Sequence, residues 1–118
     1  MPVPIDELKA SLEAVAVAIV SDDGRMLHSA LPSGVSAESF AVMSATIVGA
    51  AATVSSDLKQ TPPDHIVIRG TDFTTILARL DSASLLVTVV GATSDADRVL
   101  HDIDEFILTH RPAPHATG

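Results

Sequence analysis

The sequence predicts a layered α/β (α+β) domain with one five-stranded, mostly antiparallel sheet and helices on both faces. Five short runs rich in β-branched residues are joined mostly by tight turns, which favours antiparallel pairing. Some of these runs, such as residues 85–90, are apolar on both sides, so both faces of the sheet need cover. The chain has 118 residues and a hydrophobic content of 47%, which is enough to bury one core.

The element order is expected to be α-β-β-α-β-β-β-α. Asp23 and Gly24 suit a tight turn between the first two strands, because glycine adopts the positive φ that such a turn needs. Ser36 is expected to cap the long second helix, and Pro62 follows its end. The expected elements are a helix at 5–14, strands at 15–20 and 26–30, a helix at 36–60, strands at 65–69, 73–80 and 84–90, and a last helix that starts at Thr93 or Ser94.

The sequence predicts one domain, over residues 1–110, and a flexible C-terminal tail over residues 111–118, which hold two prolines and a terminal glycine. The first residues have no basic segment that leads into a long apolar stretch, as a secretory signal would. The chain also contains no cysteine, which excludes disulfides and thiolate metal sites. We therefore expect a cytoplasmic protein.

Composition argues against two classes of partner. The net charge is -8, with only seven Lys and Arg and no Tyr or Trp, which is unlike a nucleic-acid-binding surface. The uncharged run 39–56 is long enough to raise the question of a membrane span. It contains four serines, two threonines and mostly small side chains, so a buried helix of a soluble protein is the preferred interpretation and no membrane span is expected.

Two sides of the long helix carry different residues when it is projected at 100° per residue. We expect one stripe to face the core: Phe40, Met43, Ile47, Ala51, Val54 and Leu58. The opposite flank is small and uncharged: Ala41, Ala45, Val48, Gly49 and Ala52. Alanine can serve helix propensity alone on an exposed surface, but a mid-helix glycine usually has a packing reason. The preferred interpretation is that a second helix packs closely on this flank.

No constellation of side chains indicates catalysis, a metal or a cofactor. The five histidines, His28, His65, His101, His110 and His115, include no pair at the helical spacing of metal ligands. The glycines are isolated, so no phosphate-binding loop is present and the chain is not itself a GTPase. Arg25 lies in a predicted turn and is not assigned as an arginine finger, because an exposed turn residue is the commoner case. We expect a protein that is not an enzyme.

Several segments resemble one known family. They are the hairpin 15–30 with its Asp-Asp-Gly turn, the stretch Leu-Pro-Ser-Gly-Val-Ser-Ala-Glu before an alanine-rich helix, and the Asp-Ala-Asp-Arg-Val-Leu of the last helix. With the element order, they resemble the roadblock/dynein light chain family in its compact prokaryotic form, over residues 5–108. The resemblance implies a profilin/roadblock-like fold.

The resemblance also implies a homodimer in which the long helices pack side by side and the third strands pair across the axis. The implied dimer interface is Ala41, Ala45, Val48, Gly49, Ala52, His65, Ile66, Val67, Ile68 and Arg69. It further implies binding to a Ras-like small GTPase, which the protein regulates or scaffolds without chemistry of its own. The alternative is a small-molecule-sensing module on a similar five-stranded sheet, although three phenylalanines offer little to line a ligand pocket.

Overall fold

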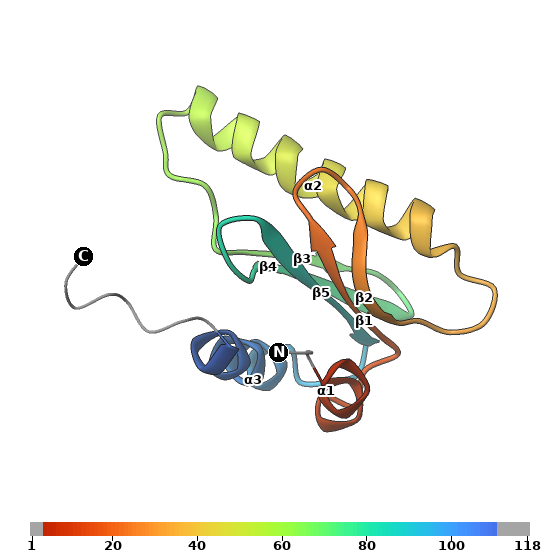
Figure 1. The fold of residues 1–118 in the computed structure, drawn as a ribbon. Helices are drawn as coiled ribbons and strands as arrows, with labels where there is room; N and C mark the ends of the chain where they lie inside the picture. The colour runs from red at the N-terminus through yellow and green to blue at the C-terminus, as the bar shows by residue number, and fades with distance from the viewer. Residues whose placement is uncertain (1–3, 111–118) are drawn as a thin grey trace.

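A computed structural model describes residues 4–110 of the chain, so the predicted C-terminal tail lies outside the described residues. One antiparallel sheet has the strand order β2-β1-β5-β4-β3, with α2 on one face and α1 and α3 on the other (Figure 1). The elements are α1 (Ile5–Ser11), β1 (Ala16–Ser21), β2 (Met26–Ala30), α2 (Ala37–Asp57), β3 (His65–Arg69), β4 (Phe73–Arg79), β5 (Ser84–Gly91) and α3 (Ala96–His110). The predicted fold class and element order are confirmed.

The core consists of two layers because side chains alternate across each strand. On β1, Val17 and Ile19 join the cluster beneath α1 and α3, whereas Ala18 and Val20 join the cluster beneath α2. The larger cluster belongs to the α1 and α3 face, where α3 contributes Ile103. The central strands β1 and β5 are therefore apolar on both sides, as the sequence predicts.

The helix caps agree with the sequence at one helix and differ at another. The Ser36 side chain accepts a hydrogen bond from the Ser39 backbone N–H at 3.2 Å, so the predicted cap of α2 is confirmed. At the start of α3, Asp95 accepts bonds from the backbone N–H groups of Asp97 and Arg98 at 3.1 and 3.2 Å. The prediction of Thr93 or Ser94 was wrong because the carboxylate of Asp95 supplies this cap.

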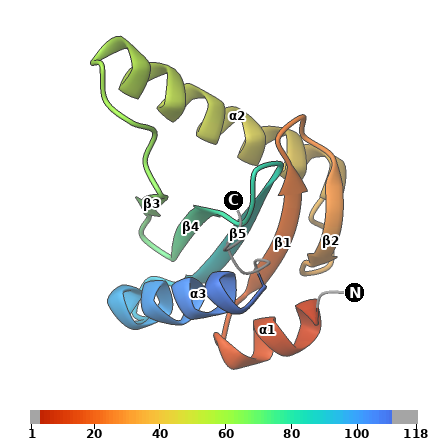
Figure 2. The ribbon, with the colours of Figure 1, turned by 60° about the vertical axis from the view of Figure 1, so that its left-hand side comes forward.

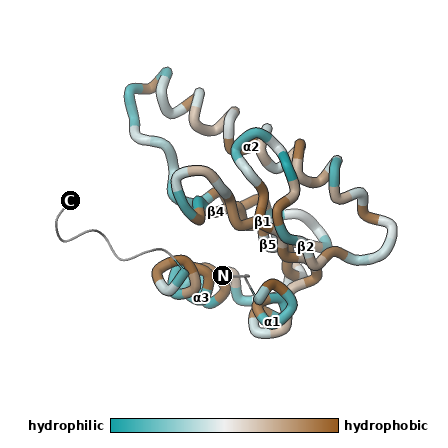
Figure 3. The backbone as a smooth tube through the Cα atoms, in the orientation of Figure 1, coloured by the Kyte–Doolittle hydropathy of each residue, from teal (hydrophilic) through white to brown (hydrophobic). Residues whose placement is uncertain are grey.

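The long helix α2 is much more exposed than the sequence predicts. Only Ala41 and Ser44 are buried along its length, and its C-terminal end stands away from the strands in two views (Figures 1 and 2). The middle of α2 is nevertheless pale to brown on the hydropathy scale, whereas α1 and α3 alternate between teal and brown (Figure 3). By length and composition alone α2 is apolar enough to cross a membrane. The expectation of a buried helix is therefore wrong for this single chain.

Candidate interaction surface

Three residues of the predicted outer flank of α2 face the sheet of their own chain. Ala41 is fully buried, and Ala45 and Val48 pack against the core cluster beneath α2. Ala52 is half-buried. Their predicted outward placement was wrong, because helical periodicity shows which residues share a side but not which side faces the sheet. A charge at Ala45 would therefore damage the chain's own packing before it affected an interface.

The small residues of α2 mark a close approach to the β1–β2 turn. A Cβ atom added to Gly24 would lie 3.4 Å from the Cα of Val42 and 3.9 Å from the Cβ of Ala45. Gly24 also has a φ of +86°, a conformation that favours glycine. The turn can lie this close to Val42 and Ala45 because Gly24 has no side chain.

The predicted core stripe of α2 is only partly buried: Phe40 and Ile47 pack against the cluster beneath α2, but other members face away from the sheet. Met43 and Val54 are 56% and 58% exposed. Gly49 is also exposed, and no atom of the described part of the chain lies within 4 Å of a Cβ built on it. We call Met43, Gly49 and Val54 the outer side of α2. An apolar helix side with no charge along it is unusual on a monomer surface.

The strand β3 forms one edge of the sheet, and two hydrogen bonds show which of its backbone groups point outward. The backbone N–H of Arg79 donates to the carbonyl of Asp64 at 3.4 Å, and that of Gly70 donates to the carbonyl of Phe73 at 2.8 Å. Hydrogen-bonded pairs alternate in an antiparallel ladder. The β3–β4 register then directs the backbone groups of three residues to the open edge: His65, Val67 and Arg69.

The side chains of β3 divide between the two faces of the sheet. Ile66 packs against the cluster beneath α2, and Ile68 lines a groove beside the same helix. Val67 is 37% exposed. The Nε2 atom of His65 lies 2.8 Å from Oδ1 of Asp104 and ties β3 to α3. The structure thus brings the predicted β3 residues together, with Ile66 in the chain's own core and the others at or near the edge.

The opposite edge strand, β2, is irregular. The register between β1 and β2 shifts after Ile19, and Leu27 is the extra residue of a bulge. Bulges at sheet edges hinder pairing with another chain. The five-residue β3 ladder has no such shift. Of the two edges, β3 is therefore the one suited to added pairing.

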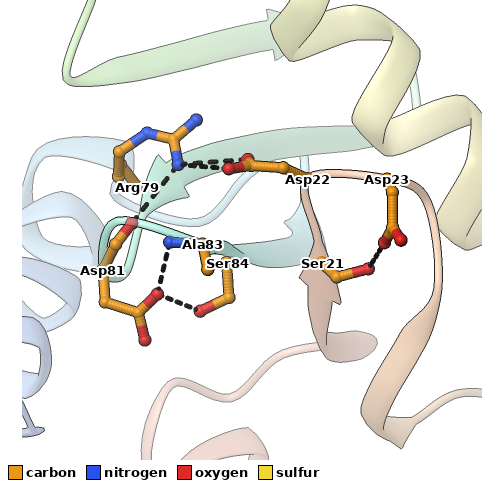
Figure 4. Close-up of polar contacts among 7 residues, drawn as sticks. All are labelled: Ser21, Asp22, Asp23, Arg79, Asp81, Ala83 and Ser84. Atoms are coloured by element: carbon orange, nitrogen blue, oxygen red, sulfur yellow. Dashed lines mark hydrogen bonds and ion pairs between the residues drawn. The ribbon is translucent and has the colours of Figure 1, made fainter.

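Polar contacts join two turns at one end of the sheet (Figure 4). Nη1 of Arg79 lies 3.1 Å from Oδ1 of Asp22, which connects β4 to the β1–β2 turn. Burial acts to raise the pKa of Asp81, but hydrogen bonds from the Ala83 backbone and the Ser84 hydroxyl outweigh it and hold that pKa below its usual value. The Ser21 hydroxyl likewise lowers the pKa of Asp23. These contacts stabilise the turns around Arg79.

Two open grooves, each of about 350 Å³, separate α2 from the sheet. One lies beside the N-terminal half of α2 and includes Phe40, Met43 and Ile68. The other lies beneath the C-terminal half and includes Val48, Ala52 and Ile66. Both are openings where the helix and the sheet do not pack fully.

Groups considered for chemistry lie apart. Within residues 4–110, no three His, Asp or Glu side chains are placed to hold a metal ion. His101 and Glu105 pair on the exposed side of α3, 3.5 Å apart. Arg25 is exposed in the β1–β2 turn, 3.6 Å from Asp23. These are surface ion pairs of small energetic weight.

The exposed apolar helix side and the regular sheet edge are features of a small regulatory or binding module. The Roadblock/LC7 domain model matches residues 5–90. The chain belongs to the Roadblock/LC7 family.

Solved structures share this fold. Myxococcus xanthus MglB superposes with a TM-score of 0.82 at 19% identity, over 89% of this chain and 88% of that chain. A Roadblock/LC7 domain from Streptomyces avermitilis gives 0.81 at 15%, over 91% and 94%. Schizosaccharomyces pombe profilin gives 0.66 at 12%, over 89% and 91%, so the profilin/roadblock-like prediction is confirmed. No curated protein matches the chain in sequence.

Sequence reasoning missed the outer side of α2, although one signal was available. The hydroxyls of Thr46 and Thr53 bond to the carbonyls of Val42 and Gly49, at 2.8 and 3.0 Å. A threonine hydroxyl that bonds to a carbonyl of its own helix needs no partner in the sheet. Two threonines seven residues apart therefore indicate the side of the helix that faces outward, and Gly49 lies on the same side.

Proposed function

We propose that the chain is a cytoplasmic homodimer that regulates or scaffolds a Ras-like small GTPase and has no chemistry of its own. The observation that carries the proposal is an unpaired, regular β3 edge on a chain whose α2 also exposes an uncharged, apolar side. Family membership supports the GTPase partner, which the resemblance of the sequence implies.

The proposed dimer surface follows the structure and not the helix flank expected from the sequence. It consists of the outer side of α2 together with His65, Val67, Ile68 and Arg69 of β3. Pairing of two β3 strands would satisfy the outward backbone groups, which an exposed edge otherwise offers to any chain. Burial of Met43 and Val54 in a dimer would stabilise it by about 25 cal/mol for each Å² of apolar surface removed from water.

Two substitutions test the dimer. Met43→Glu places a carboxylate on the outer side of α2, and its burial without a partner costs several kcal/mol. Val67→Pro removes an N–H that points to the open edge and leaves the bonds to β4 in place. We expect sedimentation velocity at micromolar concentration to show a wild-type dimer and two dissociated variants.

The matched control is Leu108→Glu, since Leu108 is 74% exposed on α3, on the other face of the sheet. This variant should remain dimeric. A monomeric wild type, or variants that stay dimeric with unchanged affinity, would contradict the proposed surface.

The GTPase partner is tested by capture. The tagged dimer should retain a Ras-like GTPase from lysate of its native cell, and retention should differ between GDP and a non-hydrolysable GTP analogue. A regulator must discriminate, because a ligand with equal affinity for two states shifts neither. The Met43→Glu variant, compared with Leu108→Glu, shows whether capture requires the dimer.

Small-molecule sensing is a second candidate, favoured by the two grooves of about 350 Å³. That volume lies at the lower end of the usual range of about 300–1,000 Å³ for ligand pockets. Native mass spectrometry of the purified chain discriminates the two functions. A retained small molecule, lost on unfolding, would favour sensing over the GTPase regulator.

A further inference from the structure

A groove beneath the C-terminal half of α2 is separate from the proposed dimer surface. We call it the α2 groove. Its lining includes Asp22, Val48, Ala52, Asp64, Ile66 and Arg79. None of these residues belongs to the outer side of α2 or to the outward-pointing residues of β3. The groove is therefore a candidate for a second binding surface.

The floor and the rim of the α2 groove differ in chemistry. Val48, Ala52 and Ile66 are half-buried and present aliphatic surface to the groove, whereas Leu77 and Leu85 lie deeper and are each 1% exposed. The rim carries two carboxylates, at Asp22 and Asp64, and one guanidinium, at Arg79. Because Asp22 already pairs with Arg79 at 3.1 Å, the charge that the rim presents outward is the exposed carboxylate of Asp64.

We propose that the α2 groove binds a short segment of a partner polypeptide that has a bulky apolar side chain next to a lysine or arginine. The apolar side chain would occupy the aliphatic floor. The adjacent cation would approach Asp64 at the rim, in the field of a chain with net charge -8. Apolar anchors with charged neighbours are a common mode of peptide recognition.

The polar groups favour a peptide over a small molecule. Sites for small molecules usually enclose the ligand and direct several polar groups at it. In the α2 groove the guanidinium of Arg79 faces Asp22 and the carbonyl of Asp81, at 3.3 Å, so it serves the turns. An open apolar channel with one charge at the rim matches a side chain and its neighbour in a polypeptide.

Nuclear magnetic resonance titration of the 15N-labelled chain with synthetic peptides tests this proposal without a GTPase, so its failure leaves the proposed function untouched. The probes are acetyl-Gly-Gly-Leu-Lys-Gly-Gly-amide and two matched peptides, with Leu replaced by Ala and with Lys replaced by Glu. We expect the first peptide to shift the amide signals of Val48, Ala52, Ile66 and Leu77. The Glu peptide should bind about 2–5-fold more weakly than the Lys peptide. This range corresponds to about 0.4–1 kcal/mol for one exposed ion pair.

Three variants connect the shifts to the groove. Ala52→Phe fills it and should abolish the response, provided that far-UV circular dichroism and cooperative unfolding match the wild type. Asp64→Asn should weaken the Lys peptide 2–5-fold and leave the Glu peptide no weaker. Asp72→Asn removes an equally exposed carboxylate in the β3–β4 turn and should change nothing.

Several outcomes would overturn the proposal. Shifts that map elsewhere, equal binding of the Lys and Glu peptides, or an unchanged response in both Ala52→Phe and Asp64→Asn would each do so. Groove shifts that depend on protein concentration without peptide would identify a second copy as the occupant. If removal of residues 111–118 shifts the groove signals in the absence of peptide, those residues would be identified as the occupant.

Discussion

Thr88 provides the sharpest test of the core, because its side chain is fully buried and its hydroxyl has no hydrogen-bond partner among residues 4–110. On β5 it lies opposite Val17 of β1 and Ile76 of β4, which both belong to the cluster beneath α1 and α3. A hydroxyl buried without a partner costs about 1–3 kcal/mol. Valine has nearly the same shape and no hydroxyl. We therefore expect Thr88→Val to raise the free energy of unfolding by about 1–2 kcal/mol.

Urea unfolding followed by circular dichroism measures this change, at one fixed protein concentration because the stability of the proposed dimer would depend on concentration. The control is Thr109→Val on α3, where the exposed hydroxyl donates to the Glu105 carbonyl at 2.9 Å. That variant should change stability by less than about 0.5 kcal/mol. If Thr88→Val were neutral or destabilising, the hydroxyl would have a partner in solution and the account of this core would be wrong.

Two further predictions concern the turns. Gly24→Ala should destabilise the fold by about 1–3 kcal/mol, because the φ of +86° is strained for alanine and the added Cβ meets Val42; thermal unfolding checks it, and an unchanged midpoint would contradict the close contact. Asp81→Asn should lower stability at pH 7 by about 1 kcal/mol. The folded-state pKa of Asp81 is depressed, so its contribution is present above its unfolded pKa of about 3.9 and is lost as pH falls through the folded value. The free energies of unfolding of the wild type and of Asp81→Asn should therefore converge as the pH falls. A difference between them that stays constant from pH 7 to pH 2 would refute this assignment.

The strands were predictable because their signals are local. The pattern of residues 65–69 predicts a strand whose bounds match β3, and the Asp23-Gly24 turn is where the sequence places it. Register and edge position are not local properties, because they depend on which strand pairs with which. The sequence could therefore name the five β3 residues but not that only His65, Val67 and Arg69 direct backbone groups outward.

For the long helix, the sequence did not predict correctly which side faces the sheet. An apolar stripe normally identifies the core side, but α2 is apolar nearly all round, so the larger residues misled the projection. Small residues such as Ala41 and Ala45 face the sheet and pack against the cluster beneath α2. Met43 and Val54 then remain outside. The sequence therefore identified Phe40 and Ile47 as core residues correctly, but it assigned part of the sheet-facing side of the helix to the interface.

The central claim is that this dimer recognises the nucleotide state of a Ras-like GTPase. Isothermal titration calorimetry of the purified chain with the GTPase captured from its own cell, loaded with GDP or with a non-hydrolysable GTP analogue, tests it most directly. We expect binding in which the two affinities differ by about tenfold or more, or about 1.4 kcal/mol. Equal affinities would mean that the protein is a scaffold and does not regulate the GTPase. Absence of binding to either nucleotide form would contradict the proposed function.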